Sequence, residues 1–144
     1  MLKVVINNCY GGFNLSYKGL KRYYELKYPE KTLYCYKEDY ETGIYHKVEN
    51  DKDSPWCSIF DHDFGETFKP DDKSELFNDS FVSAYDIKRT DPVLIQTVEE
   101  LGSEANGSCS DLVVVTIDSD RYRICEYDGA EWVETPESIE WKTA

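Results

Sequence analysis

The residues best suited to binding a ligand lie in two short segments, and the first is a turn near the N-terminus. This link contains Asn8, Tyr10, Gly11 and Gly12 and joins a strand-like run to a helix-like one. Glycine lets backbone N–H groups approach an anion, and the start of the next helix adds a partial positive charge. Tyr10 offers a ring for stacking. The segment is neither a Walker motif nor G-x-G-x-x-G. It could therefore form either a phosphate-binding site or an ordinary turn without a ligand.

The second segment is Arg89-Thr90-Asp91-Pro92. The planar fork of an arginine could pair with a phosphate or a carboxylate. The structural alternative is that Asp91 caps a helix beginning at Pro92, while Arg89 pairs with one of the many acids. If the two segments meet in space, we predict a ligand site that consists of Asn8, Tyr10, Gly11, Gly12, Arg89 and Asp91.

Other side chains with chemical potential are scattered. Cys57, Asp61, His62 and Asp63 could bind a metal, but they come from one short stretch and the only other histidine is His46. We interpret that stretch as an exposed acidic loop and expect neither a metal nor a cofactor. No serine-hydrolase, EF-hand or paired-carboxylate motif is present, so we assign no catalytic residue and favour a protein that is not an enzyme.

The elements that would position these segments predict an α+β fold with a mostly antiparallel sheet, two principal helices and a single domain. Ser16 and Asp91 are suitable N-caps, and Gly102 is a suitable C-terminal stop. Asp128-Gly129, between residues 121–127 and 130–135, is a strong hairpin signal. We predict strands at 2–6, 32–36, 44–48 and 112–117 and helices at 16–28 and 92–101. The apolar run 112–117 should be covered on both faces.

The periodic pattern is lost between residues 49 and 79. This stretch carries ten acids against three lysines and also contains five Trp or Phe rings. A disordered linker rarely has so many rings. We therefore predict an acidic, irregular and partly ordered excursion that is packed by its own rings and is the most mobile or most variable part of the chain.

The net charge of −13 excludes a surface that tracks nucleic-acid phosphates or docks on an anionic membrane. It leaves two interpretations: the charge only maintains solubility, or it faces a basic partner. The five cysteines form no C-x-x-C pair, so we predict free thiols in a cytoplasmic protein. We recognise neither a signal peptide nor a membrane-spanning run.

Two parts of the chain carry recognisable sequence motifs. The first is the opening Cys9-Tyr10-Gly11-Gly12-Phe13-x-Leu15-Ser16. The second begins with Arg89-x-Asp91-Pro92 and continues through Val98-Glu99-Glu100-Leu101-Gly102 and Ala105-Asn106-Gly107 to residues 126–132. Together these motifs resemble a family of small uncharacterised proteins from bacterial viruses and prophages. The middle of the chain does not match, and the family has no established activity. The resemblance therefore implies a phage setting rather than a mechanism.

That setting implies an accessory protein that counters bacterial immunity in the host cytoplasm. The first hypothesis is non-enzymatic sequestration of a nucleotide-type signal in a pocket. The alternative is an acidic mimic of nucleic acid that binds a basic host protein, such as a nuclease or a CRISPR effector. An enzyme acting on a nucleotide ranks third. In neither hypothesis does the protein contact nucleic acid directly. The sequence also allows the protein to form a homo-oligomer.

Overall fold

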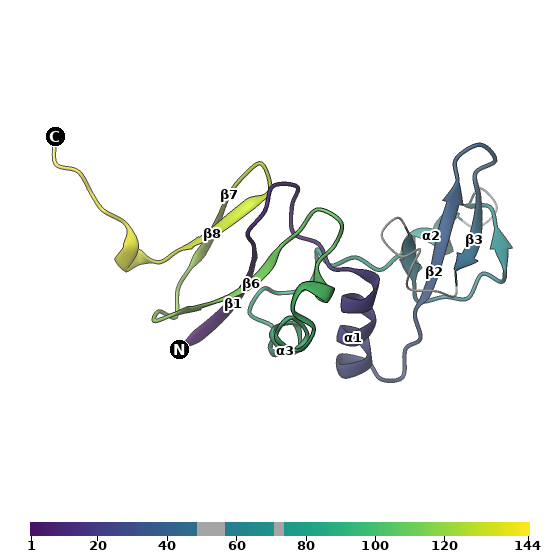
Figure 1. Cartoon of the computed structure of the whole chain (residues 1–144), viewed down its shortest axis with the longest axis horizontal. Coiled ribbons are helices and arrows are strands. Elements are labelled where there is room, and N and C mark those ends of the chain that lie inside the picture. Colours follow the sequence, from purple (N-terminus) through teal and green to yellow (C-terminus); the bar gives the residue numbers. More distant parts are fainter. Residues whose placement is uncertain (49–56, 71–73) are drawn as a thin grey trace.

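The computed structural model describes residues 1–48, 57–70 and 74–144 and has an α+β fold with antiparallel strand pairs. Figure 1 shows an elongated molecule. Strands β1, β6, β7 and β8 lie toward one end, β2, β3 and α2 lie at the other, and helices α1 and α3 lie between them. Among the described residues, no helix is long and apolar enough to cross a membrane.

Strands from the two ends of the sequence pair with each other. β1 (Leu2–Asn7) runs antiparallel to β6 (Leu112–Ile117), with Leu2 opposite Ile117. β7 (Arg123–Tyr127) and β8 (Ala130–Glu134) form the hairpin that Asp128-Gly129 predicts. The predicted strands at both ends of the chain are therefore confirmed, although the sheet is divided into separate pieces.

The two principal helices begin and end at the predicted signals. Ser16 caps α1 (Tyr17–Lys27) by accepting a hydrogen bond from the Gly19 amide at 2.9 Å. Asp91 caps α3 (Pro92–Leu101), since its carboxylate accepts from the Val93 amide at 2.9 Å. The 3₁₀ turn η3 (Gly102–Ala105) follows. Each cap satisfies an amide that has no partner inside its helix, which fixes where the helix starts.

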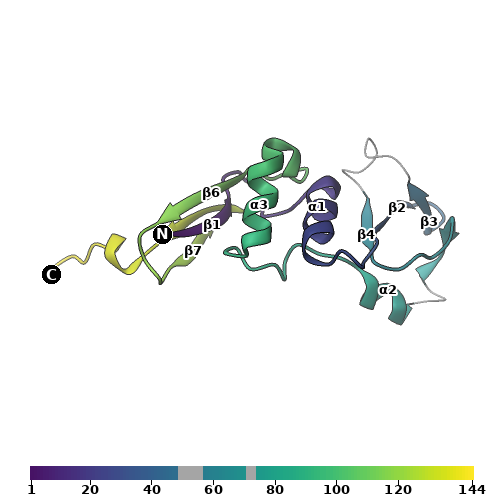
Figure 2. The ribbon, with the colours of Figure 1, turned by 90° about the horizontal axis from the view of Figure 1, so that it is seen from below.

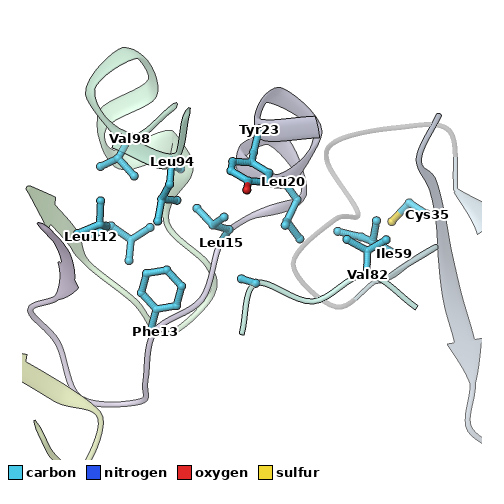
Figure 3. Packing of buried hydrophobic residues seen from close by; sticks show 13 residues of the cluster. Phe13, Leu15, Leu20, Tyr23, Cys35, Ile59, Val82, Leu94, Val98 and Leu112 are labelled. Carbon is cyan, nitrogen blue, oxygen red and sulfur yellow. The ribbon is translucent and has the colours of Figure 1, made fainter. Parts of the chain in front are cut away.

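The main core lies where α1 and α3 pack beside β1 and β6. Val5 and Leu94 have no exposed surface, and Leu15 and Val98 are almost fully buried. Figure 3 shows Phe13, Leu15, Leu94, Val98 and Leu112 converging between the strands and α3. The same cluster continues past Leu20 and Tyr23 to Cys35, Ile59 and Val82. This continuity joins the helical part to the other end of the molecule.

A second group of strands forms what we term the distal lobe, the described residues 34–48, 57–70 and 74–80. Its strands are β2 (Tyr34–Asp39), β3 (Ile44–Val48), β4 (Ser58–Phe60) and β5 (Thr67–Phe68), in the order β4-β2-β3-β5. Helix α2 (Ser74–Ser80) follows them. The core of the distal lobe consists of Tyr36, Tyr45, Phe60, Phe64 and Phe68.

The structure describes only part of the predicted excursion at residues 49–79. Residues 49–56 and 71–73 lie outside the described residues. The described portion contains β4, β5 and most of α2, and the rings of Phe64 and Phe68 stack at 4.2 Å between centroids. The mobility of this stretch stays a prediction.

The prediction that residues 112–117 are covered on both faces is wrong. In β6, Val113, Val114 and Val115 are only half-buried, and Thr116 is exposed. The continuous apolar run is typical of a central strand, but β6 pairs only with β1 in the described chain. An apolar run alone does not distinguish these two positions.

The β7–β8 hairpin turn packs against the glycine turn of residues 11 and 12. Asp128 and Gly129 have φ of 51° and 88°, as a two-residue hairpin turn of type I′ requires. The Gly11 amide donates to the Asp128 carbonyl at 3.1 Å. A Cβ atom at Gly129 would lie 2.3 Å from the Gly12 nitrogen. Position 129 therefore needs glycine both for its backbone angle and for this close approach.

We predict that Gly129→Ala lowers the free energy of unfolding by about 2 kcal/mol or more, because alanine adds a steric clash to backbone strain. Gly65→Ala is the matched control, since Gly65 has φ of 85° but, apart from its chain neighbours, no atom of the described residues lies within 4 Å of an added Cβ. Its cost should be about 1 kcal/mol. Urea unfolding measures both variants. Equal losses would show that the contact with Gly12 contributes nothing.

Candidate functional site

Arg89 is held by an ion pair inside the protein. Its two terminal nitrogens donate to the two carboxylate oxygens of Glu131 at 2.7 and 2.9 Å. One of them also donates to the Val5 carbonyl at 3.2 Å, and the guanidinium lies 3.6 Å from the centre of the Phe13 ring. The side chains of Arg89 and Glu131 keep only 21% and 9% of their exposure. The Arg89 guanidinium, which could bind a phosphate, therefore binds the Glu131 carboxylate instead.

Asn7 links this ion pair to the glycine turn. It is fully buried, and its backbone amide donates to the Glu131 carboxylate at 2.8 Å. Its side-chain amide donates to the carbonyls of Cys9 and Gly129 at 2.7 and 2.8 Å. Its side-chain oxygen accepts from the Asp111 amide at 2.8 Å. We term Asn7, Phe13, Arg89 and Glu131 the Arg89 cluster.

The structure places Arg89 beside Phe13, the residue that follows the glycine turn, but several donors of the two predicted segments are engaged internally. The Asn8 amide donates to the Asp111 carbonyl, and the Gly11 amide is used by Asp128. Tyr10 is exposed. The binding role of these residues stays a prediction. Sequence reasoning missed Asn7, Phe13 and Glu131, because no local pattern marks a pairing between residues so far apart in the chain.

Asp91 lies away from the Arg89 cluster, in a contact between α1 and α3. Its carboxylate accepts from the Tyr23 hydroxyl at 2.7 Å and from the Lys27 ammonium. Burial raises the pKa of Asp91, but hydrogen bonds from Lys27, Tyr23 and Val93 outweigh it, so the pKa lies below its ordinary value. Burial also raises the pKa of Tyr23 to about 12. Asp91 is thus both the helix cap and the partner of Lys27.

A cavity of about 520 Å³ lies beside this contact, between α1 and the chain that leads to α3. Tyr24 and Tyr28 contribute half-buried rings whose centroids are 5.2 Å apart. Two lysines, Lys27 and Lys88, and two residues with hydroxyl side chains, Ser83 and Thr90, are also among the lining residues. The rest of the lining consists of Tyr23, Phe81, Val82, Asp86, Ile87, Asp91 and Pro92. We term it the tyrosine–lysine cavity.

A second cavity, also of about 520 Å³, lies on the other side of residues 81–83. Phe81, Val82 and Ser83 line both cavities. Gly11 and Gly12 reach this second cavity, together with the start of α1 and residues 106–109. Among the described residues that line it, none is Asp, Glu, Lys, Arg or His. The two predicted segments therefore contribute to different cavities, since Asp91 lines the first and the glycines line the second.

The remaining sequence candidates have structural partners. Asp63 accepts from the Lys47 ammonium at 2.7 Å, and the His62 ring lies 4.8 Å from that of Phe64. Among the described residues, no three His, Cys, Asp or Glu side chains are grouped so that they could hold a metal ion. All five cysteines lie in the described residues and none of them forms a disulfide, as predicted.

Comparison with known proteins finds no matching family model, no similar curated protein and no similar solved structure. The phage resemblance of the sequence therefore stays a prediction. Function has to be inferred from the geometry of the two cavities and of the surface around them.

We predict that Arg89→Ala lowers the free energy of unfolding by about 2–3 kcal/mol, because it leaves the Glu131 carboxylate buried and unpaired. Arg89→Lys should recover only part of the loss, since lysine lacks the planar fork. In a double-mutant cycle, Arg89→Ala with Glu131→Ala should cost about 1 kcal/mol less than the sum of the single changes. Additive losses in chemical denaturation would contradict a direct pairing.

We predict that Asp91→Asn makes stability less sensitive to acid. Asparagine can still cap the helix, but it lacks the charge that pairs with Lys27. The carboxyl pKa is depressed in the folded state, so its contribution is present above the unfolded pKa of about 4 and is lost as the pH falls through the folded pKa. At pH 7 the free energy of unfolding of Asp91→Asn should be about 1–3 kcal/mol lower than that of the parent protein. This difference should become smaller below about pH 4. A difference that does not change with pH would contradict the ion pair between Asp91 and Lys27.

Proposed function

We propose that the protein is a non-enzymatic binding protein that takes up a nucleotide-type small molecule in the tyrosine–lysine cavity. The observation that supports this most directly is the combination of paired tyrosine rings with two lysines in one cavity of a protein whose net charge is −13. A volume of about 520 Å³ lies within the range of small-molecule sites.

The chemistry of the lining fits the two halves of a nucleotide. A base can stack on the rings of Tyr24 and Tyr28, because every base has a π-face. Lys88 has no ion-pair partner in the described chain, so its charge is available to a phosphate. Lys27 shares its charge with Asp91, whereas the hydroxyls of Ser83 and Thr90 add neutral donors. A ligand with one or two phosphates is matched better than a long polyanion, which the acidic surface repels.

In the phage setting that the sequence implies, the ligand would be a nucleotide signal of bacterial immunity. Sequestration needs only tight binding and slow release, and no bond in the ligand has to break. This agrees with a cavity built from rings, hydroxyls and lysines rather than from a nucleophile next to a base.

The distal lobe supports a second candidate function. Its described residues carry eight acidic side chains against three lysines, and several of the acids, among them Asp39, Glu41 and Glu66, are exposed. Such a surface could occupy the nucleic-acid site of a basic host protein. Under this second candidate function, the tyrosine–lysine cavity binds no nucleotide. A nucleotide-binding experiment therefore distinguishes the two candidates.

The test is isothermal titration with a panel of mono-, di- and cyclic nucleotides. Lys88→Ala should weaken binding about fivefold, which corresponds to about 1 kcal/mol for an exposed charge. Lys21→Ala is the matched control, because Lys21 is an exposed lysine of α1 outside the cavity lining and has no described ion pair. It should bind like the parent protein.

Equal weakening by both variants would show that only net charge matters and would contradict the cavity. If no nucleotide binds, the acidic distal lobe becomes the better candidate. Its own test is binding to a basic nuclease, which Asp39→Asn with Glu41→Gln should weaken.

A further inference from the structure

The hydrogen-bond pattern of β1 and β6 shows which backbone groups of β6 point away from the sheet. The Asn8 amide donates to the Asp111 carbonyl at 2.8 Å, and these two residues are opposite each other when the β1–β6 register is extended by one residue. In an antiparallel pair, only alternate residues direct their backbone groups at the partner strand. Residues 113, 115 and 117 therefore face β1, while Leu112, Val114 and Thr116 direct their amides and carbonyls outward.

Three other contacts agree with this pattern. The Leu112 amide points away from β1 and donates to the Asn106 side chain at 2.8 Å. On the opposite edge of β1, the Val5 amide donates to the Arg89 carbonyl and the Asn7 amide donates to Glu131. On β1 the outward amides of Val5 and Asn7 therefore have partners, whereas on β6 the described chain provides a partner only for the outward amide of Leu112.

The outer edge of β6 is open beyond that point. Within the described chain, no partner is found for the backbone groups of Val114 and Thr116, and no strand pairs with this edge. In Figure 2, β1 lies between β6 and β7, so β6 is the outer strand of this group. Natural sheets usually protect such edges with a charge, a proline or a bulge. The sequence Leu-Val-Val-Val-Thr-Ile of β6 has no charge and no proline.

We propose that the open edge of β6 binds an extended segment of a basic partner protein by strand addition. The partner's backbone would pair with Val114 and Thr116, and its apolar side chains would extend the half-buried face of Val113, Val115 and Ile117. This surface is separate from the tyrosine–lysine cavity, and the inference stands whether or not that cavity binds a nucleotide.

The charged residues at the two ends of β6 indicate which kind of partner would bind its open edge. Asp111 precedes the strand, and Asp118 and Asp120 follow it; all three are exposed. These acids lie at both ends of an uncharged strand, so they match a partner strand with lysine or arginine at each end, about 23 Å apart. A second copy of this chain would bring its own acids and a further charge of −13 to the same place.

The probe is a synthetic peptide of alternating valine and threonine, with lysine and arginine at both ends. Thr116→Pro removes only an outward amide on an exposed residue, which an edge strand tolerates. It should weaken peptide binding at least about tenfold. Thr116→Ala keeps the amide and should bind like the parent. Fluorescence anisotropy measures binding, and thermal unfolding checks that each variant is folded.

Two further measurements do not depend on the proline variant. The same peptide with N-methylated amides on one edge should not bind the unaltered protein, because it cannot form the ladder. Asp111→Asn with Asp118→Asn and Asp120→Asn should weaken binding about three- to tenfold and flatten its salt dependence.

The proposal is overturned if the basic peptide does not bind, if it binds Thr116→Pro as well as the parent, or if the N-methylated peptide binds equally. It is also overturned if sedimentation shows a dimer that Thr116→Pro dissociates, because the occupant would then be a second copy.

Discussion

The half-buried ion pair between Arg89 and Glu131 is the contact on which the arrangement of the β1–β6 part depends. Removing both charges from water is costly, and such a pair persists only when its remaining hydrogen-bond capacity is used. Here the Val5 carbonyl, the Asn7 amide and the Phe13 ring supply these additional contacts. The pair therefore does more than join two residues. It fixes β1, the glycine turn, the approach to α3 and the last hairpin in one geometry.

The same contact determines how the chain between the distal lobe and α3 presents its side chains. Arg89 turns its guanidinium toward Phe13, while its neighbours Lys88 and Thr90 line the tyrosine–lysine cavity. Asp91 then ends the segment by capping α3 and pairing with Lys27 of α1. A cavity whose wall is anchored at both ends is preorganised, and preorganisation lowers the entropy that a ligand loses on binding.

Local signals in the sequence predicted local structure well. Ser16, Asp91 and Asp128-Gly129 mark helix starts and a hairpin turn, because each acts on backbone groups within a few residues. The partners of Arg89 were not predictable, since Glu131 is one of 29 acids and nothing local distinguishes it. The division of the strands into three sheets and the edge position of β6 also depend on long-range packing. Of the predicted ligand residues, Arg89 lies beside Phe13 at the end of the glycine turn, but Asp91 lies elsewhere, and Arg89 and the amides of Asn8 and Gly11 are used in internal contacts.

The pairing of β1 with β6 has a consequence for how the protein is made. β1 can pair only once its partner strand β6 has been synthesised, and the elements from α1 to η3 lie between the two strands in the sequence. Until then Val4, Val5 and Ile6, which are buried in the finished protein, have no sheet to join. The strands of the distal lobe, in contrast, pair with near neighbours and can close early. We therefore expect the apolar strand β1 to stay unpaired during part of synthesis, and we expect the long loop between β1 and β6 to slow their pairing.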